Sequence, residues 1–323
     1  MSIINNNKNN IQKNKKSTNK AKGKILVILG PTASGKTVLG VRLANKYSGE
    51  IVSADSRQVY QGMDIGTAKD LQEYQINQKK IPYHLIDIIS PKKEFNLANY
   101  QSLAFIAIAD ILQRDKLPII VGGSGLYLQA LVDNYYLSSI KPNFKQRKAR
   151  ENLGKTELFN LLLSLKPDFA NKLNNSDKNN PRRLIRYLEI LEGEDKPNKT
   201  IESSYEFLIL GLDPADDILR ERIVKRIKYR LEKEDMIGEV ERLHEEGVSW
   251  QRLISFGLEY KFISYYLLEK LSYEEMFEKL SNASYRFAKR QKTWFKRWQK
   301  QGRDIIWLED DEEAELALNL FLD

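Results

Sequence analysis

The sequence predicts an α/β fold in which helices flank a parallel sheet, with a helical insertion and further helices near the C-terminal end. Three observations predict this fold. Six short apolar runs have the continuous character of strands that are buried on both faces. Helix-length segments separate most of these runs, in the alternation typical of βαβ units. One long polar interval with helical character delays the fifth run and is interpreted as an insertion.

The elements follow from local patterns. The predicted strands cover residues 23–30, 49–56, 82–89, 116–124, 207–214 and 303–310. Residues 94–116 carry apolar side chains at helical spacing, with Asn96 as a plausible N-terminal cap and Pro118 just beyond the helix. Residues 217–247 and 259–298 are each predicted to form a long helix.

The domain organisation follows from these elements. Residues 1–22 are rich in lysine and asparagine and are predicted to be a disordered basic tail. Residues 23–136 form the first part of the core, residues 137–204 form the insertion, and residues 205–323 complete the core and add the C-terminal helices. An Asn/Asp-rich break at 174–180 divides the insertion into two helical pieces, which we expect to move as a unit over a cleft.

Composition excludes several functional classes. The 323 residues include no cysteine, so a disulfide framework, a thiolate metal site and a cysteine nucleophile are impossible. No apolar run approaches the roughly 20 residues that a bilayer crossing needs, and the N-terminal tail lacks the apolar segment of a secretory signal. We therefore expect a cytoplasmic protein without a membrane partner.

The net charge of +8 is less informative than its distribution. The first 22 residues hold six lysines and no acids, which leaves +2 for the rest of the chain. Residues 141–155 carry six basic residues against one acidic residue, and residues 286–303 carry eight basic residues and no acidic one. Such stripes are either solvated helix faces or contacts to phosphate, and composition alone leaves both readings open.

The most specific motif is "GPTASGKT", which follows the first predicted strand and precedes a helix. It fits the pattern G-x-x-x-x-G-K-[ST] of a P-loop, so the fold is expected to be P-loop NTPase-like. In such a loop, backbone N–H groups and the helix N-terminus surround an anion, the lysine adds a cation and the last hydroxyl can bind Mg²⁺. The residues predicted to bind phosphate are Gly30, Pro31, Thr32, Ala33, Ser34, Gly35, Lys36 and Thr37.

The identity of the polyphosphate is a separate question. A kinase or NTPase normally places an acid at the end of a later apolar strand, yet the run at 116–124 ends in two glycines and Ser124. An acid, Asp55, does stand at the end of the second predicted strand, where it is expected to face the ligand of the phosphate loop. Asp55 could equally cap a turn together with Ser56.

Six motifs together resemble the tRNA dimethylallyltransferases. They are "GPTASGKT", "DSRQVYQGMDIGTAK", "PYHLIDI", "GGSGLYLQALV", "NPRRLIRYLEI" and "FAKRQKTWF", in the family's order and spacing over residues 24–300. The resemblance implies that dimethylallyl diphosphate donates its dimethylallyl group to the N6 amine of the adenosine immediately 3′ of the anticodon. It also implies tRNAs that read codons beginning with U, Mg²⁺ as cofactor, and diphosphate as the second product.

The resemblance assigns roles residue by residue. Asp55 would accept the proton of the amine, Lys36 and Arg226 would hold the diphosphate, and Thr37 would bind Mg²⁺. Without the resemblance, Arg226 is one basic residue on a solvated helix face. The family's contacts with the tRNA anticodon stem-loop correspond here to Asp55, Ser56, Arg57, Gln58, Ser124, Arg147, Arg182, Arg183, Leu184, Ile185 and Arg186. The family commonly has threonine at the position of Ser124, and "SFGLEYKF" departs from its usual pattern.

Several residues are expected to be structural. His84 and His244, the only histidines, are interpreted as satisfied structural side chains. Phe287, Trp294 and Trp298 recur at helical spacing and are expected to pack inward, while the basic residues between them reach tRNA phosphate.

Two other functions share these features. A P-loop nucleotide kinase or NTPase with a helical lid would turn over ATP. A non-catalytic RNA-binding protein would bind tRNA without forming a product. A monomer requires the fewest assumptions, because the RNA is itself the second macromolecule.

Overall fold

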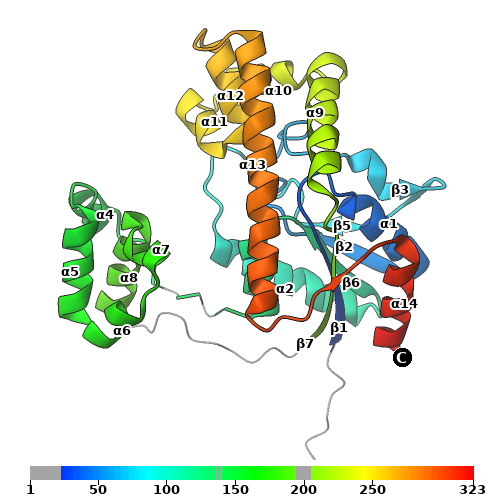
Figure 1. The fold of residues 1–323 in the computed structure, drawn as a ribbon, viewed down its shortest axis with the longest axis horizontal. Coiled ribbons are helices and arrows are strands. Elements are labelled where there is room, and N and C mark those ends of the chain that lie inside the picture. The colour runs from blue at the N-terminus through cyan, green and yellow to red at the C-terminus, as the bar shows by residue number, and fades with distance from the viewer. Residues whose placement is uncertain (1–22, 136, 139, 194–204) are drawn as a thin grey trace, which may run out of the picture.

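A parallel sheet forms the centre of the protein in the computed structural model, which describes residues 23–135, 137–138, 140–193 and 205–323 (Figure 1). The tail predicted for residues 1–22 lies outside this range. The strands of the described sheet are β1 (Gly23–Leu29), β2 (Gly49–Ser53), β5 (Tyr83–His84), β6 (Leu117–Gly122), β7 (Tyr205–Gly211) and β8 (Ile306–Trp307). Their order is β5-β2-β6-β1-β7-β8, and each pair is parallel, which confirms the predicted fold class.

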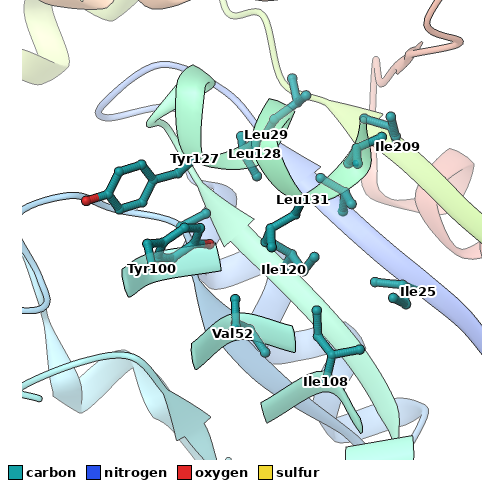
Figure 2. Packing of buried hydrophobic residues seen from close by; sticks show 14 of the residues in the cluster. Ile25, Leu29, Val52, Tyr100, Ile108, Ile120, Tyr127, Leu128, Leu131 and Ile209 are labelled. Carbon is teal, nitrogen blue, oxygen red and sulfur yellow. The ribbon is translucent and has the colours of Figure 1, made fainter. Parts of the chain in front are cut away.

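Strand β1 shows why the central runs are continuously apolar. Alternate side chains point to opposite faces of a strand, so a strand covered on both sides needs apolar residues at every position. Ile25, Val27 and Leu29 belong to one core cluster, and Leu26 and Ile28 belong to another. Figure 2 shows the first cluster, where Ile25 and Leu29 of β1 pack with neighbours on β6, β7, α2 and α3.

Helices cover both faces of the sheet. They are α1 (Lys36–Lys46), α2 (Leu97–Gln113), α3 (Gly125–Val132) and α14 (Asp311–Leu322). The predicted cap is confirmed, because the side chain of Asn96 accepts a hydrogen bond from the backbone N–H of Asn99 and completes a capping box. The third predicted strand is shorter than expected: it pairs with β2 through Tyr83 and His84 at the sheet edge, and Ile89 forms an isolated bridge with Tyr60. A 3₁₀ helix, η1 (Leu71–Tyr74), precedes a small hairpin of β3 (Gln75–Ile76) and β4 (Lys79–Lys80).

A helical layer stands over the carboxyl ends of the strands (Figure 1). It consists of α9 (Asp216–Lys233), α10 (Met236–Glu245), α11 (Trp250–Phe256), α12 (Leu258–Leu267) and α13 (Tyr273–Lys300). The two predicted long helices are therefore each broken. Asp235 adopts a left-handed φ of 56° and caps α10, and Ser272 starts α13 with a capping box. Caps of this kind end one amphipathic segment and start the next without interrupting the apolar pattern.

The insertion forms a helical unit beside the core (Figure 1). Its helices in the described chain are α4 (Phe144–Arg150), α5 (Lys155–Leu165), α6 (Pro167–Lys172), α7 (Asn175–Lys178) and α8 (Pro181–Glu192). The prediction that the insertion has two helical pieces was wrong, because the predicted break at 174–180 itself contains helix α7. The insertion has its own apolar cluster, built mainly from α5 and α8. Across the described residues, the helices lack the combination of length and apolar character required to cross a bilayer.

Candidate active site

A cavity of about 840 Å³ opens at the carboxyl ends of β1, β2 and β6, beneath the helical layer. Ligands of open α/β sheets bind at this edge. The predicted site residues on its wall are Thr32, Ala33, Gly35, Lys36, Thr37, Asp55, Ser56, Arg57, Gln58, Ser124 and Arg226. Gly30, Pro31 and Ser34, the other residues of the phosphate loop, are not among the residues that line the cavity. The structure thus brings the loop after β1 and the loop after β2 together, as predicted.

The phosphate loop leaves its helix N-terminus open to a ligand. Gly35 precedes α1 with φ of 92°, and no side chain caps this end of the helix. Unpaired N–H groups and the helix dipole together favour an anion at such a position. Gly30 leaves room for the backbone of Leu212, just after β7, since a Cβ on Gly30 would lie 3.0 Å from the carbonyl oxygen of Leu212.

Two basic side chains contact this loop, one from the loop itself and one from α9. Lys36 Nζ donates to the carbonyl oxygen of Pro31 at 3.1 Å, and burial lowers the pKa of Lys36 to about 8 although the charge of Asp55 opposes the shift. Arg226, from α9, donates to the hydroxyl of Thr32. Burial, followed by repulsion from Arg230, lowers the pKa of Arg226 to about 10, so this guanidinium stays charged at neutral pH. Arg226 is therefore part of the cavity and not a solvated surface residue.

Asp55 combines the two roles that the sequence left open. One carboxylate oxygen accepts the backbone N–H of Arg57 at 2.8 Å, which is an Asx-type turn. The same side chain lines the cavity and raises the pKa of Lys36 by its charge. Ser124 supports this loop from the end of β6, because its hydroxyl accepts the N–H of Ser56 at 3.1 Å. The hydroxyl that serine shares with threonine therefore has a defined contact.

The next two residues of the loop differ in availability. The guanidinium of Arg57 lies over the ring of Phe256 at 5.5 Å, and burial lowers the pKa of Arg57. Gln58 is held by the chain itself: its carbonyl oxygen accepts the hydroxyl of Ser53 at 2.8 Å, and its amide donates to Ala68 at 2.9 Å. Reading a base edge with Gln58 would require exchanging these bonds, whereas Arg57 has donors to spare.

The turn in the unusual segment "SFGLEYKF" lines the cavity. Gly257 and Leu258 join α11 to α12 with φ of 77° and 42°. Glycine adopts such a conformation freely, but it is strained for leucine. Glu259 follows on the same wall, and burial raises the pKa of its carboxyl group.

The insertion residues predicted to contact tRNA lie away from the cavity, on α4 and α8. Arg147 of α4 and Arg186 of α8 both pair with the buried carboxylate of Glu189 on α8, at 2.7 and 3.2 Å, so Arg147 joins α4 to α8. Arg183 pairs with Asp177 at 2.5 Å, and Arg182 is exposed. Leu184 and Ile185 are buried in the cluster of the insertion, so their role is corrected to packing and a direct RNA contact by their side chains is not supported.

The basic stripe at 286–303 separates into two groups. Lys292 and Lys296 of α13 pair with Asp213, and Lys289 pairs with Asp216. Arg286 and Arg290 instead line the cavity, as does Phe287. Of the aromatic residues predicted to pack inward, Trp298 is buried at 1% exposure, and Trp294 is partly buried against the sheet cluster.

Both histidines have structural contacts, as predicted. His84 Nε2 lies 2.8 Å from Glu50, which also pairs with Arg114. His244 Nδ1 lies 3.0 Å from the carbonyl oxygen of Val248, and its ring stacks on Trp250.

Sequence reasoning missed two residues that support the site. Gln291 of α13 contacts the phosphate loop, although the only signal was its place inside the motif "FAKRQKTWF". Glu239 of α10 is buried at 3% exposure, and no local pattern distinguished it from other acidic residues. Its carboxylate accepts the backbone N–H groups of Asp64, Ile65 and Gly66 and the hydroxyl of Tyr260, at 2.6 to 3.0 Å. Glu239 thereby holds the cavity wall that contains Gly66.

The acid that phosphoryl transfer normally requires is not at the end of β6, where Gly122, Gly123 and Ser124 follow one another. Asp213, beyond the end of β7, is held by Lys292 and Lys296 of α13. In the described chain, no three side chains of the His, Cys, Asp and Glu types are grouped to hold a metal ion.

Comparisons with known proteins agree with this geometry. The family model described as IPP transferase matches residues 58–298. A tRNA dimethylallyltransferase 1 of Syntrophus aciditrophicus is 46% identical over 294 residues, which cover 90% of this chain and 95% of the relative. A tRNA isopentenylpyrophosphate transferase of Bacillus halodurans has a similar structure, with a TM-score of 0.67, 34% identity and coverage of 93% and 96%. A eukaryotic dimethylallyltransferase acting on tRNA gives a TM-score of 0.71 at 28% identity, over 84% of this chain and 69% of the other.

Proposed function

Because this chain belongs to the IPP transferase family, we propose that it is an enzyme that transfers a dimethylallyl group to tRNA in the cavity described above. The single observation that carries the proposal is the pairing of two functions in one cavity. The phosphate loop, with Lys36 and Arg226, forms one wall of the cavity. Asp55 lies on the wall beyond β2, which is separated from β1 by β6 in the sheet. A reaction in which a neutral amine displaces diphosphate needs both an anion-binding loop for the leaving group and a base for the amine.

The phosphate loop binds the leaving group. Dimethylallyl diphosphate is the donor, and its carbon–oxygen bond breaks as negative charge accumulates on the departing diphosphate. In this proposal, the negative charge develops beside the open N-terminus of α1 and the cationic side chains of Lys36 and Arg226, which stabilise it. No phosphoryl group moves, which agrees with the glycines at the end of β6.

The donor set also fits Mg²⁺ as the cofactor. Magnesium usually keeps several waters and takes one or two protein ligands together with the oxygens of a bound phosphate. The hydroxyl of Thr37 lies on the cavity wall in the first turn of α1 and suits that role. When bound, the ion would neutralise charge on the leaving diphosphate.

Asp55 acts on the adenine amine that accepts the dimethylallyl group. The lone pair of the adenine N6 amine is delocalised into the ring, so the amine is a weak nucleophile. Asp55 orients this amine and accepts one of its protons as the new carbon–nitrogen bond forms. The atoms balance, since the amine gains the dimethylallyl group and loses a proton while diphosphate takes the electrons of the broken bond. The Asx-type turn with Arg57 fixes the carboxylate for this task.

The adenosine reaches Asp55 only after it leaves the stack of the anticodon loop. Arg57, Arg286 and Arg290 lie on the cavity wall and supply donors for the extruded nucleotide and its flanking phosphates. On the insertion, exposed Arg182 is the best placed to contact backbone phosphate, while Arg147 fixes the helices that present it. The acceptor is the adenosine immediately 3′ of the anticodon in tRNAs that read codons beginning with U, and one copy of the chain acts in the cytoplasm on such tRNAs.

One experiment tests the proposal. The protein is incubated with dimethylallyl diphosphate, Mg²⁺ and unmodified tRNA, and the nucleosides are analysed by mass spectrometry beside an ATPase assay. Prenylated adenosine without ATP turnover is the expected result. ATP turnover alone would favour a kinase or NTPase, and tRNA binding without product would favour an RNA-binding protein.

A further inference from the structure

Gln291 of α13 makes a two-ended bridge at the cavity. Its carbonyl oxygen accepts the backbone N–H of Thr32, in the phosphate loop, at 2.9 Å. Its amide nitrogen donates to the carbonyl oxygen of Gly123, just after β6, at 2.8 Å. The side chain is only 7% exposed, so both bonds form largely away from competing water.

The glycines after β6 make this bridge possible. A Cβ on Gly123 would lie 2.4 Å from the amide nitrogen of Gln291, and one on Gly125 would lie 2.4 Å from the ring of Trp294. Helix α13 therefore rests directly on the backbone of this turn. Packing, in addition to the two hydrogen bonds, fixes where the amide of Gln291 points.

The same turn carries the loop of Asp55. Ser124 accepts the N–H of Ser56 at 3.1 Å, and the N–H of Ala54 donates to the carbonyl oxygen of Val121 at 2.7 Å. Two short connections thus meet at the end of β6, one from the phosphate loop through Gln291 and one from the Asp55 loop through Ser124.

We infer that Gln291 is a positioning residue that sets the phosphate loop at a fixed distance from the loop of Asp55. The inference rests on the proposed function, in which the first loop holds the leaving diphosphate and the second addresses the amine. Displacement at carbon requires nucleophile, carbon and leaving group to be aligned, and such alignment is sensitive to shifts of an ångström or less. Gln291 acts through the backbone of Thr32 and does not react itself.

Gln291→Met tests the inference with Gln299→Met as a matched control. Gln299, an exposed residue of the same helix, also makes two hydrogen bonds, since it accepts from the ring N–H of Trp307 at 3.0 Å and donates to the carbonyl oxygen of Ile305 at 3.3 Å, outside the cavity. Both variants lose two hydrogen bonds. We expect Gln291→Met alone to lower kcat by about 10- to 100-fold, with the Kd for tRNA and the KM for the donor within about threefold.

Equal kcat values for Gln291→Met and Gln299→Met would overturn the inference, because they would reduce Gln291 to ordinary packing. Gln291→Glu provides a second readout that depends on protonation. Its carboxylate can still accept from Thr32, but only the protonated acid can donate to Gly123. The ratio of variant to parent kcat should therefore rise as pH falls from 8 to 6, and a flat ratio would contradict the bridge. Absence of prenylated adenosine from the unsubstituted chain would instead refute the proposed function itself.

Discussion

Asp55→Asn is the substitution that separates chemistry from structure most cleanly at this site. Asparagine retains a side-chain oxygen that can accept the N–H of Arg57, so the turn observed at 2.8 Å is preserved. What disappears is the negative charge and the ability to accept a proton. General-base assistance contributes about 10²- to 10⁴-fold, which corresponds to about 3–5 kcal/mol in the barrier. We expect a loss of this size in the single-turnover rate at saturating donor and tRNA.

A second effect of the substitution has a different signature. The charge of Asp55 raises the pKa of Lys36, so its removal lets that pKa fall below about 8. The free variant then loses part of the Lys36 charge at pH 8, and donor binding weakens. Lowering the pH restores this charge and therefore the donor KM, but it does not restore the missing base. The loss of single-turnover rate should persist at every pH.

The assay measures prenylated adenosine by mass spectrometry and tRNA affinity by filter binding. Asp70→Asn is the matched control, because it removes another carboxylate of the same cavity, one that is held by Arg230 at 2.7 Å. It should lower the rate far less than Asp55→Asn does. Single-turnover rates for Asp55→Asn within a few-fold of the parent would remove Asp55 from the mechanism.

Three further predictions concern the surroundings of the site. The anionic donor binds Lys36 in its protonated form, and the pKa of Lys36 is about 8 in the free protein. Donor affinity should therefore fall as the pH rises above about 8. A titration of the donor KM against pH should show this fall for the parent and a flatter curve for Lys36→Arg, because arginine stays charged. Glu239→Ala leaves the backbone N–H of Gly66 and the hydroxyl of Tyr260, whose bonds to Glu239 are buried, without their acceptor and should cost at least about 2 kcal/mol in urea unfolding, against almost nothing for exposed Glu241→Ala. Arg182→Gln and Arg290→Gln should each weaken binding of all tRNAs alike and reduce the salt slope by about one; unchanged slopes would assign both residues to structure.

The sheet was predictable because its signal is local. Each central strand is buried on both faces, so its apolar run is continuous and short, and β1 illustrates this with core residues on both sides. The helix breaks were not predictable in the same way. Asp235, the N-cap of α10, marks the boundary between α9 and α10, but it is one of several acidic residues in this polar stretch, so its capping role was not distinguished from the sequence.

The site residues also differ in how well the sequence could predict them. The phosphate loop occupies eight consecutive residues, and Asp55 directly follows a strand, so both could be placed from the sequence. Gln291 and Glu239 act on partners that lie far away in the chain: 259 residues separate Gln291 from Thr32, and 175 separate Glu239 from Asp64. Neither contact leaves a local pattern. The ion pair between Arg147 and Glu189 was not predictable for a related reason, because Glu189 lies 42 residues beyond Arg147 in the chain.

The glycines after β6 connect the fold to the type of reaction. In a phosphoryl-transfer enzyme this strand end normally supplies an acid to the metal and the nucleophile. Here Gly123 has no side chain, and the space that a side chain would occupy is filled by the amide of Gln291 from α13. This strand end therefore lacks an acid that would orient water towards a phosphate, and Gln291 in its place supports the phosphate loop. In the proposed function, such a cavity binds diphosphate without an acid at the end of β6 to assist attack on phosphorus, and the proposed base is Asp55, just beyond β2.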